Sequence, residues 1–72
     1  MKGRSFRLKT PTLGILSIDS NGHRIPVTLP LHAVVTVEAE PLDGNRLVDV
    51  LWEGKTIMMF TQDLRERGEE IT

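Results

Sequence analysis

The residues that most often carry out chemistry are few in this chain and widely spaced. The only histidines are His23, which follows an Asn-Gly pair, and His32, which lies two residues after a proline. Neither has the spacing to a second ligand that a zinc site requires. There is no cysteine, so no disulfide and no thiolate ligand is available. The sequence therefore predicts no metal site and no cofactor.

The carboxylates and hydroxyls likewise lack the arrangement of a catalytic site. Acidic side chains occur singly in expected turns and on strand faces, at Asp19, Asp43, Asp49 and Glu53. The serines are Ser5, Ser17 and Ser20. None of these serines lies in a nucleophile elbow, and no glycine-rich loop is present to cradle a phosphate. We predict no catalytic residues and favour a binding role over enzyme activity.

Basic residues gather near the N-terminus although the net charge is only −1. Residues 1–24 contain five bases and one acid, whereas residues 38–72 contain four bases and nine acids, so the two segments carry +4 and −5. Arg4, Arg7 and Lys9 are candidates for contact with a nucleic-acid backbone. The chain has only three aromatic residues for base stacking. We therefore favour pairing of these bases with the acidic half, within the fold or between subunits, and keep nucleic-acid binding as the alternative.

Alternating apolar and polar residues predict a chain made mostly of short strands. The expected strands span residues 6–9, 13–18, 24–29, 34–39, 47–51 and 56–60, and residues 61–65 should form one helical or 3₁₀ turn. Asn21-Gly22 and Glu53-Gly54 predict hairpin turns, and Pro26 places its strand at an edge or at a bulge. Residues 1–72 should form a single all-β domain, with residues 67–72 as a frayed tail.

One segment also resembles a known fold family. The run from Leu47 to Phe60 contains a V-x-V-x-W-x-G pattern and is followed by Asp63-Leu64. This run is similar to the distal hairpin and closing turn of small bacterial SH3-like barrel proteins. The resemblance implies an SH3-like barrel of about five antiparallel strands with a short C-terminal 3₁₀ or helical turn. It implies no particular function, because such barrels host unrelated activities.

A weaker similarity links the same segment to the plasmid-encoded, trimethoprim-resistant dihydrofolate reductases, which are tetramers of SH3-like barrels around a shared pore. Gly54 and the apolar run that follows it match the position of the pore strand. Met58 and Phe60, however, stand where that family has a glutamine and a tyrosine, and no lysine occurs in residues 36–38. A pore enzyme of this kind is therefore only a third alternative.

The segment 47–60 is apolar on both faces, whichever face points to the core. Val48 and Val50 alternate with Leu47 and Leu51, and Ile57 and Met59 alternate with Met58 and Phe60. A free-standing barrel should show one polar face. We predict self-association of a homo-oligomer through Leu47, Leu51, Met58 and Phe60. The competing interpretation is a monomer in which Phe6, Leu8 and Leu13 fold back over the second face.

The remaining expectations concern partners and location. The longest nearly apolar stretch, residues 27–37, is interrupted by threonine, proline and histidine, so no membrane span is expected. The basic N-terminus lacks the apolar region of a secretory signal, which makes a cytoplasmic location the default expectation. The sequence does not name a protein partner.

Overall fold

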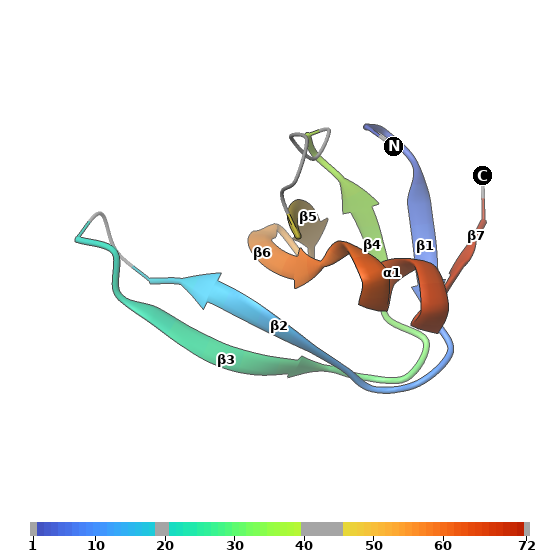
Figure 1. The fold of residues 1–72 in the computed structure, drawn as a ribbon, viewed down its shortest axis with the longest axis horizontal. Helices are drawn as coiled ribbons and strands as arrows, with labels where there is room; N and C mark the ends of the chain where they lie inside the picture. The colour runs from blue at the N-terminus through green and yellow to red at the C-terminus, as the bar shows by residue number, and fades with distance from the viewer. Residues whose placement is uncertain (1, 19–20, 40–45, 72) are drawn as a thin grey trace.

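A computed structural model describes residues 2–18, 21–39 and 46–71, which form one antiparallel sheet and a short helix (Figure 1). The elements in chain order are β1 (Ser5–Leu8), β2 (Thr12–Ser17), β3 (Arg24–Leu29), β4 (Val34–Val37), β5 (Leu47–Trp52), β6 (Lys55–Phe60), α1 (Thr61–Arg67) and β7 (Gly68–Glu70). The strand order is β3-β2-β6-β5-β4-β1-β7, so the sheet is open and β3 and β7 are its edges. The all-β expectation is confirmed, with seven strands in the described residues rather than about five.

Both expected hairpins form, with different turns. Trp52 lies opposite Lys55, and Glu53 and Gly54 have φ values of 50° and 77°, as in the type I′ turn that suits a two-residue connection. In the other hairpin, Ser17 lies opposite Arg24. The N–H of Ile18 donates to the carbonyl of His23 at 3.0 Å, so this connection is longer than the two-residue turn between Trp52 and Lys55. Asp19 and Ser20 lie outside the described residues.

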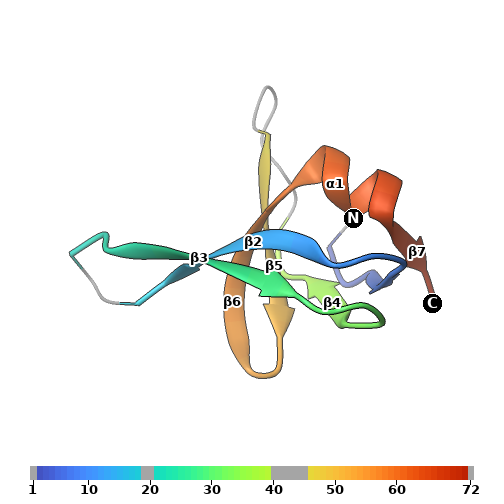
Figure 2. The same ribbon diagram turned by 90° about the horizontal axis from the view of Figure 1, so that it is seen from below.

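Pro26 lies in β3, an edge strand, which is the first of the two positions, edge or bulge, that its missing N–H predicted. The hairpin of β2 and β3, which we call the arm, leaves the rest of the sheet along most of its length. Only Ile15 and Leu16 of β2 pair with β6, opposite Met58 and Ile57. Figures 1 and 2 show the arm projecting from the remaining elements. The arm therefore pairs with the sheet through the middle of β2.

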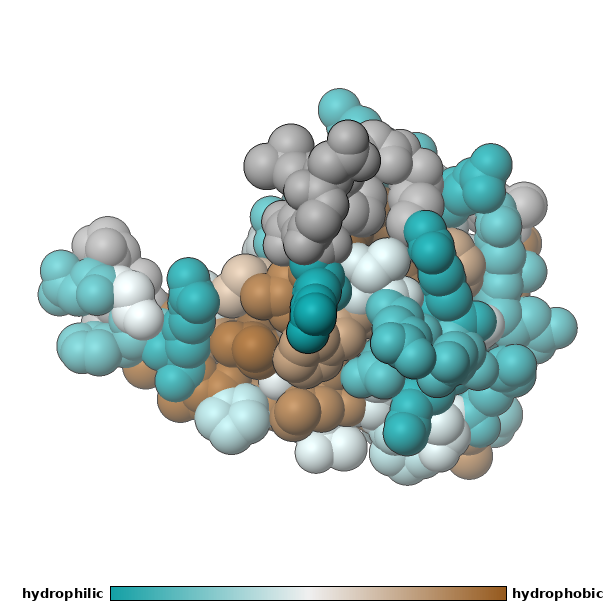
Figure 3. Space-filling model, in the orientation of Figure 1, coloured by the Kyte–Doolittle hydropathy of each residue, from teal (hydrophilic) through white to brown (hydrophobic). Residues whose placement is uncertain are grey.

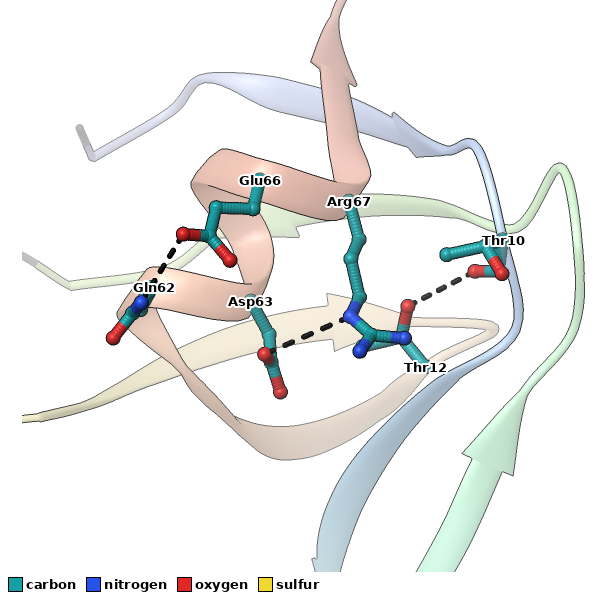
Figure 4. Close-up of polar contacts among 6 residues, drawn as sticks. All are labelled: Thr10, Thr12, Gln62, Asp63, Glu66 and Arg67. Atoms are coloured by element: carbon teal, nitrogen blue, oxygen red, sulfur yellow. Dashed lines mark hydrogen bonds and ion pairs between the residues drawn. The ribbon is translucent and has the colours of Figure 1, made fainter.

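The core lies on one face of the curved sheet, and α1 lies across this face. Every second residue of the strands points its side chain into this core, and Leu64 of the helix joins them. The buried apolar residues are Phe6, Leu8, Leu29, Ala33, Val35, Val37, Val48, Val50, Ile57, Met59 and Leu64. Thr12 is also buried, and its hydroxyl donates to the Thr10 carbonyl at 2.9 Å (Figure 4). This face forms the interior because β1, the consecutive strands β4, β5 and β6, and α1 all place apolar side chains on it.

A helix forms where one turn was expected over residues 61–65, but α1 is seven residues long, about two turns, and continues to Arg67. Gln62 donates to Glu66 at 3.1 Å, and Arg67 lies 3.8 Å from Asp63 (Figure 4). These exposed i,i+4 contacts contribute about 0.2–0.5 kcal/mol each. A helix this short is held mainly by burial of Leu64.

The expected fraying of residues 67–72 is wrong for Arg67, which ends α1, and for residues 68–70. These residues form β7 and pair with β1, placing Gly68 opposite Leu8. Gly68 is buried, and a Cβ at this position would lie 2.5 Å from the Leu64 carbonyl oxygen. Glycine thus lets the chain pass close to the end of α1 and reach the sheet. The short charged segment has no strand pattern of its own, so this pairing was not evident from the sequence.

Candidate self-association surface

The β5–β6 register shows which face of the apolar hairpin is inward. Asp49 lies opposite Met58, and Leu47 lies opposite Phe60. Side chains opposite each other in an antiparallel pair share a face. All four residues predicted for self-association therefore lie on the outer face: Leu47, Leu51, Met58 and Phe60. The valines of β5 and the alternate residues of β6 fill the core.

This outer face is only partly covered. Leu51 and Phe60 are each 40% exposed, and Leu47 and Met58 are half-buried. The competing expectation placed Phe6, Leu8 and Leu13 over this face. Phe6 and Leu8 are buried in the core on the other side of the sheet, whereas Leu13 lies on the outer face of β2. The outer face of the hairpin is thus an exposed apolar surface.

The arm extends this surface across a second pair of strands. Ile15 lies opposite Met58 on one side and opposite Pro26 on the other, so all three share the outer face. Leu13 shares it too and is 47% exposed. We call the whole set the outer strip, which consists of Leu13, Ile15, Pro26, Leu47, Leu51, Met58 and Phe60. In Figure 3 hydrophobic side chains gather over β2, β3 and β6, with hydrophilic ones on either side.

Sequence reasoning missed the contribution of the arm. Leu13, Ile15 and Pro26 alternate with residues that face the core, which is the ordinary pattern of a half-buried strand. Only the pairing of β2 with β6 joins them to the hairpin, and this pairing links residues more than forty positions apart. No local pattern indicates such a contact.

The basic candidates lie at the opposite edge of the sheet. Arg4, Arg7 and Lys9 are exposed. Arg7 lies opposite Glu69 of β7, and Arg4 Nε is 3.5 Å from Glu70 Oε2. The acidic end of the chain is therefore beside these bases, and its carboxylates would repel a phosphate backbone.

In the part of the chain that the structure describes, the potential metal-binding side chains do not cluster. No group of three or more potential metal ligands is found among these residues. The side chains of Met58 and Phe60 on the outer face are a thioether and a phenyl ring. They offer neither the amide nor the hydroxyl group of the glutamine and tyrosine that the plasmid-encoded reductases have at the matching positions. Trp52 is half-buried and packs against the core. The described residues also contain no helix of the length and apolarity needed to cross a membrane.

Comparisons of the chain with protein-family models, curated proteins and solved structures found no match. The functional argument therefore depends on the geometry of the surface alone.

Proposed function

We propose that this protein is a non-catalytic interaction module that self-associates through the outer strip. The observation that carries the proposal is the shared outer face of Leu47, Leu51, Met58 and Phe60, which Leu13 and Ile15 continue onto the arm. Exposed apolar patches on small proteins mark interaction sites when they are contiguous. Residues of this strip come from four neighbouring strands, β3, β2, β6 and β5.

We also propose that the fold is related to the SH3-like barrels. Three features support this relation. The last strand pairs with the first, β4, β5 and β6 follow one another in the sheet, and a helical turn lies between β6 and the last strand. The arm then corresponds to a long excursion between β1 and β4. The open sheet leaves the arm available for contact with another molecule.

The energetics favour a reversible complex. Removing apolar surface from water contributes about 25 cal/mol per Å². Shielding several partly exposed side chains on each of two copies contributes several kcal/mol, which the freedom of motion lost on association offsets in part. We expect self-association at micromolar concentrations and above. Because a two-stranded hairpin is marginally stable on its own, the contact should also stabilise the arm.

Sedimentation of the wild type and of Met58→Lys tests the proposal. A lysine at the centre of the strip would have to lose its hydration on association, so Met58→Lys should shift the protein toward its monomer mass of 8.1 kDa. Leu31→Lys is the matched control, because Leu31 is similarly apolar and 47% exposed but lies in the loop before β4. It should leave the sedimenting mass unchanged.

Two outcomes would contradict the proposal. One is a wild-type mass of 8.1 kDa at every concentration up to the millimolar range. The other is an oligomer whose mass Met58→Lys leaves unaltered, which would place the interface elsewhere. Circular dichroism of both variants establishes that the strand content is retained.

A further inference from the structure

The outer strip carries opposite charges on its two bordering strands. Arg24 lies on β3 at the outer-face position next to Pro26, toward the tip of the arm, and Asp49 lies on β5 opposite Met58. These are the first and fourth strands of the strip. The two charges therefore lie three strands apart in the order of the sheet. The strip thus has a cation on its first strand and an anion on its fourth, where Asp49 lies between Leu47 and Leu51.

Both charged side chains are free to meet a partner. Arg24 and Asp49 are exposed, and neither forms an ion pair within residues 2–18, 21–39 and 46–71. A second carboxylate strengthens the negative border. Glu38 accepts a hydrogen bond from Thr56 on the outer face, and its N–H donates to the Asp49 carbonyl at 2.9 Å.

Such a surface complements a copy of itself. In a two-fold dimer each surface patch contacts the same patch of the other subunit, so that residue i meets residue j and residue j meets residue i. A strip with opposite charges on its two outer strands satisfies this condition when the two-fold axis places the positive side of each copy against the negative side of the other. A phosphate-bearing partner would instead be repelled by the carboxylates of Asp49 and Glu38.

The edge of the arm argues for contact through the face of the sheet. β3 is an edge strand, and an unprotected edge can pair with another strand. Pro26 lies in the middle of β3 and has no N–H. Proline within a strand is tolerated where its nitrogen faces the open side, so it interrupts the row of donors along this edge. Extension of the sheet by a second β3 is therefore disfavoured.

We propose that the occupant of the outer strip is a second copy of this chain, packed face to face about a two-fold axis, with Arg24 beside the partner's Asp49 at both ends of the interface. This inference depends on the proposed function, because it specifies the orientation of the same contact. It predicts that the two charges act as a pair across the interface although they are distant within one chain.

A charge-exchange experiment tests the orientation. The variants are Arg24→Asp, Asp49→Arg and the double substitution, each analysed by sedimentation velocity over a concentration series. Each single change places like charges together and should raise the dimer dissociation constant about fivefold or more. The double variant restores opposite charges and should return to within about twofold of the wild type. Arg65→Asp, the same change on the exposed side of α1, is the control and should have no effect.

Salt provides an independent readout of the same pair. The Debye length falls to about 3 Å at 1 M salt, so the difference between the single variants and the wild type should shrink there. A purely structural effect of either substitution would persist at high salt.

The outcomes separate this inference from the proposed function. If Met58→Lys gives monomers but the double charge exchange restores nothing, the strip is the interface and the orientation proposed here is wrong. A wild type that remains monomeric overturns both. Nucleic acid bound to the strip would also overturn the assignment of a second copy as the occupant. Its co-purification would raise the absorbance at 260 nm.

Discussion

The β5–β6 hairpin and the arm have ladders of equal length but very different surroundings. Each contains six pairs of opposed residues. The β5–β6 hairpin has β4 on one side and β2 on the other, and its inner face is buried. The arm pairs with β6 through only two residues of β2, and its other strand is an open edge.

The comparison shows that the neighbours of a hairpin, more than its own ladder, decide how firmly it is held. Isoleucines illustrate the difference. Ile57 of β6 is fully buried, whereas Ile25 of β3 faces the same side of the sheet and is 42% exposed. Segments with few buried apolar contacts open at a lower cost than the global unfolding free energy. The arm is thus the part of the molecule that gains most from a partner.

Truncating one isoleucine in each hairpin should give the largest difference in the free energy of unfolding between the two regions. Ile57→Ala removes a fully buried side chain and should lower the free energy of unfolding by about 2–5 kcal/mol. Ile25→Ala makes the same chemical change in the arm and should cost only about 1 kcal/mol in the monomer, because Ile25 is already 42% exposed to water. Urea denaturation of both variants in the Met58→Lys background measures the contrast. Equal losses would show that the arm is held as firmly as the central hairpin.

The base of the arm offers a smaller test of the same contrast. A Cβ added at Gly14 would lie 2.5 Å from Cγ2 of Ile57, at the point where the two hairpins meet. Gly14→Ala should therefore cost about 1–3 kcal/mol through overpacking. Ile57→Leu moves the branch away from this contact, so the double variant should lose less than the sum of the two single changes. Strict additivity in urea denaturation would argue against contact between these residues.

The smallest expected effect is a gain at the tight turn. Glu53 has a φ of 50°, a conformation in which asparagine is preferred over glutamate. Glu53→Asn places an Asn-Gly pair in this turn and should raise the free energy of unfolding, measured by thermal denaturation, by about 0.5–1 kcal/mol. Glu69→Asn, in the exposed part of β7, is the control for loss of the carboxylate and should not stabilise the protein. A loss of stability at Glu53→Asn would mean that the glutamate makes a contact beyond its backbone conformation.

Strand and turn positions were largely predictable because their signals are local. Period-two alternation identified six strands to within a few residues, and the Gly54 turn set the two-residue connection of β5–β6. The edge position of Pro26 follows from the absence of its N–H. The strand β7 escaped prediction because its pairing depends on the distant β1 and on a glycine that fits against α1.

The candidate surface was predictable only in part. Leu47, Leu51, Met58 and Phe60 could be selected because both faces of their hairpin are apolar, but the alternation is the same for either face. The structure decides between the faces because β1, β4 and α1 cover one of them. The role of Ile15 and Leu13 required the β2–β6 contact as well.

By itself the sequence determined the antiparallel strands, the turns and an excess of apolar side chains in residues 47–60, since each of these depends on residues close together in the chain. It also indicated that the basic and acidic halves are complementary. Only the tertiary structure decided that Arg4 meets Glu70 within one chain, that Leu47 and Phe60 face outward, and that Ile15 lies beside Met58. These outcomes depend on long-range pairing, in which the whole sheet determines what each face touches.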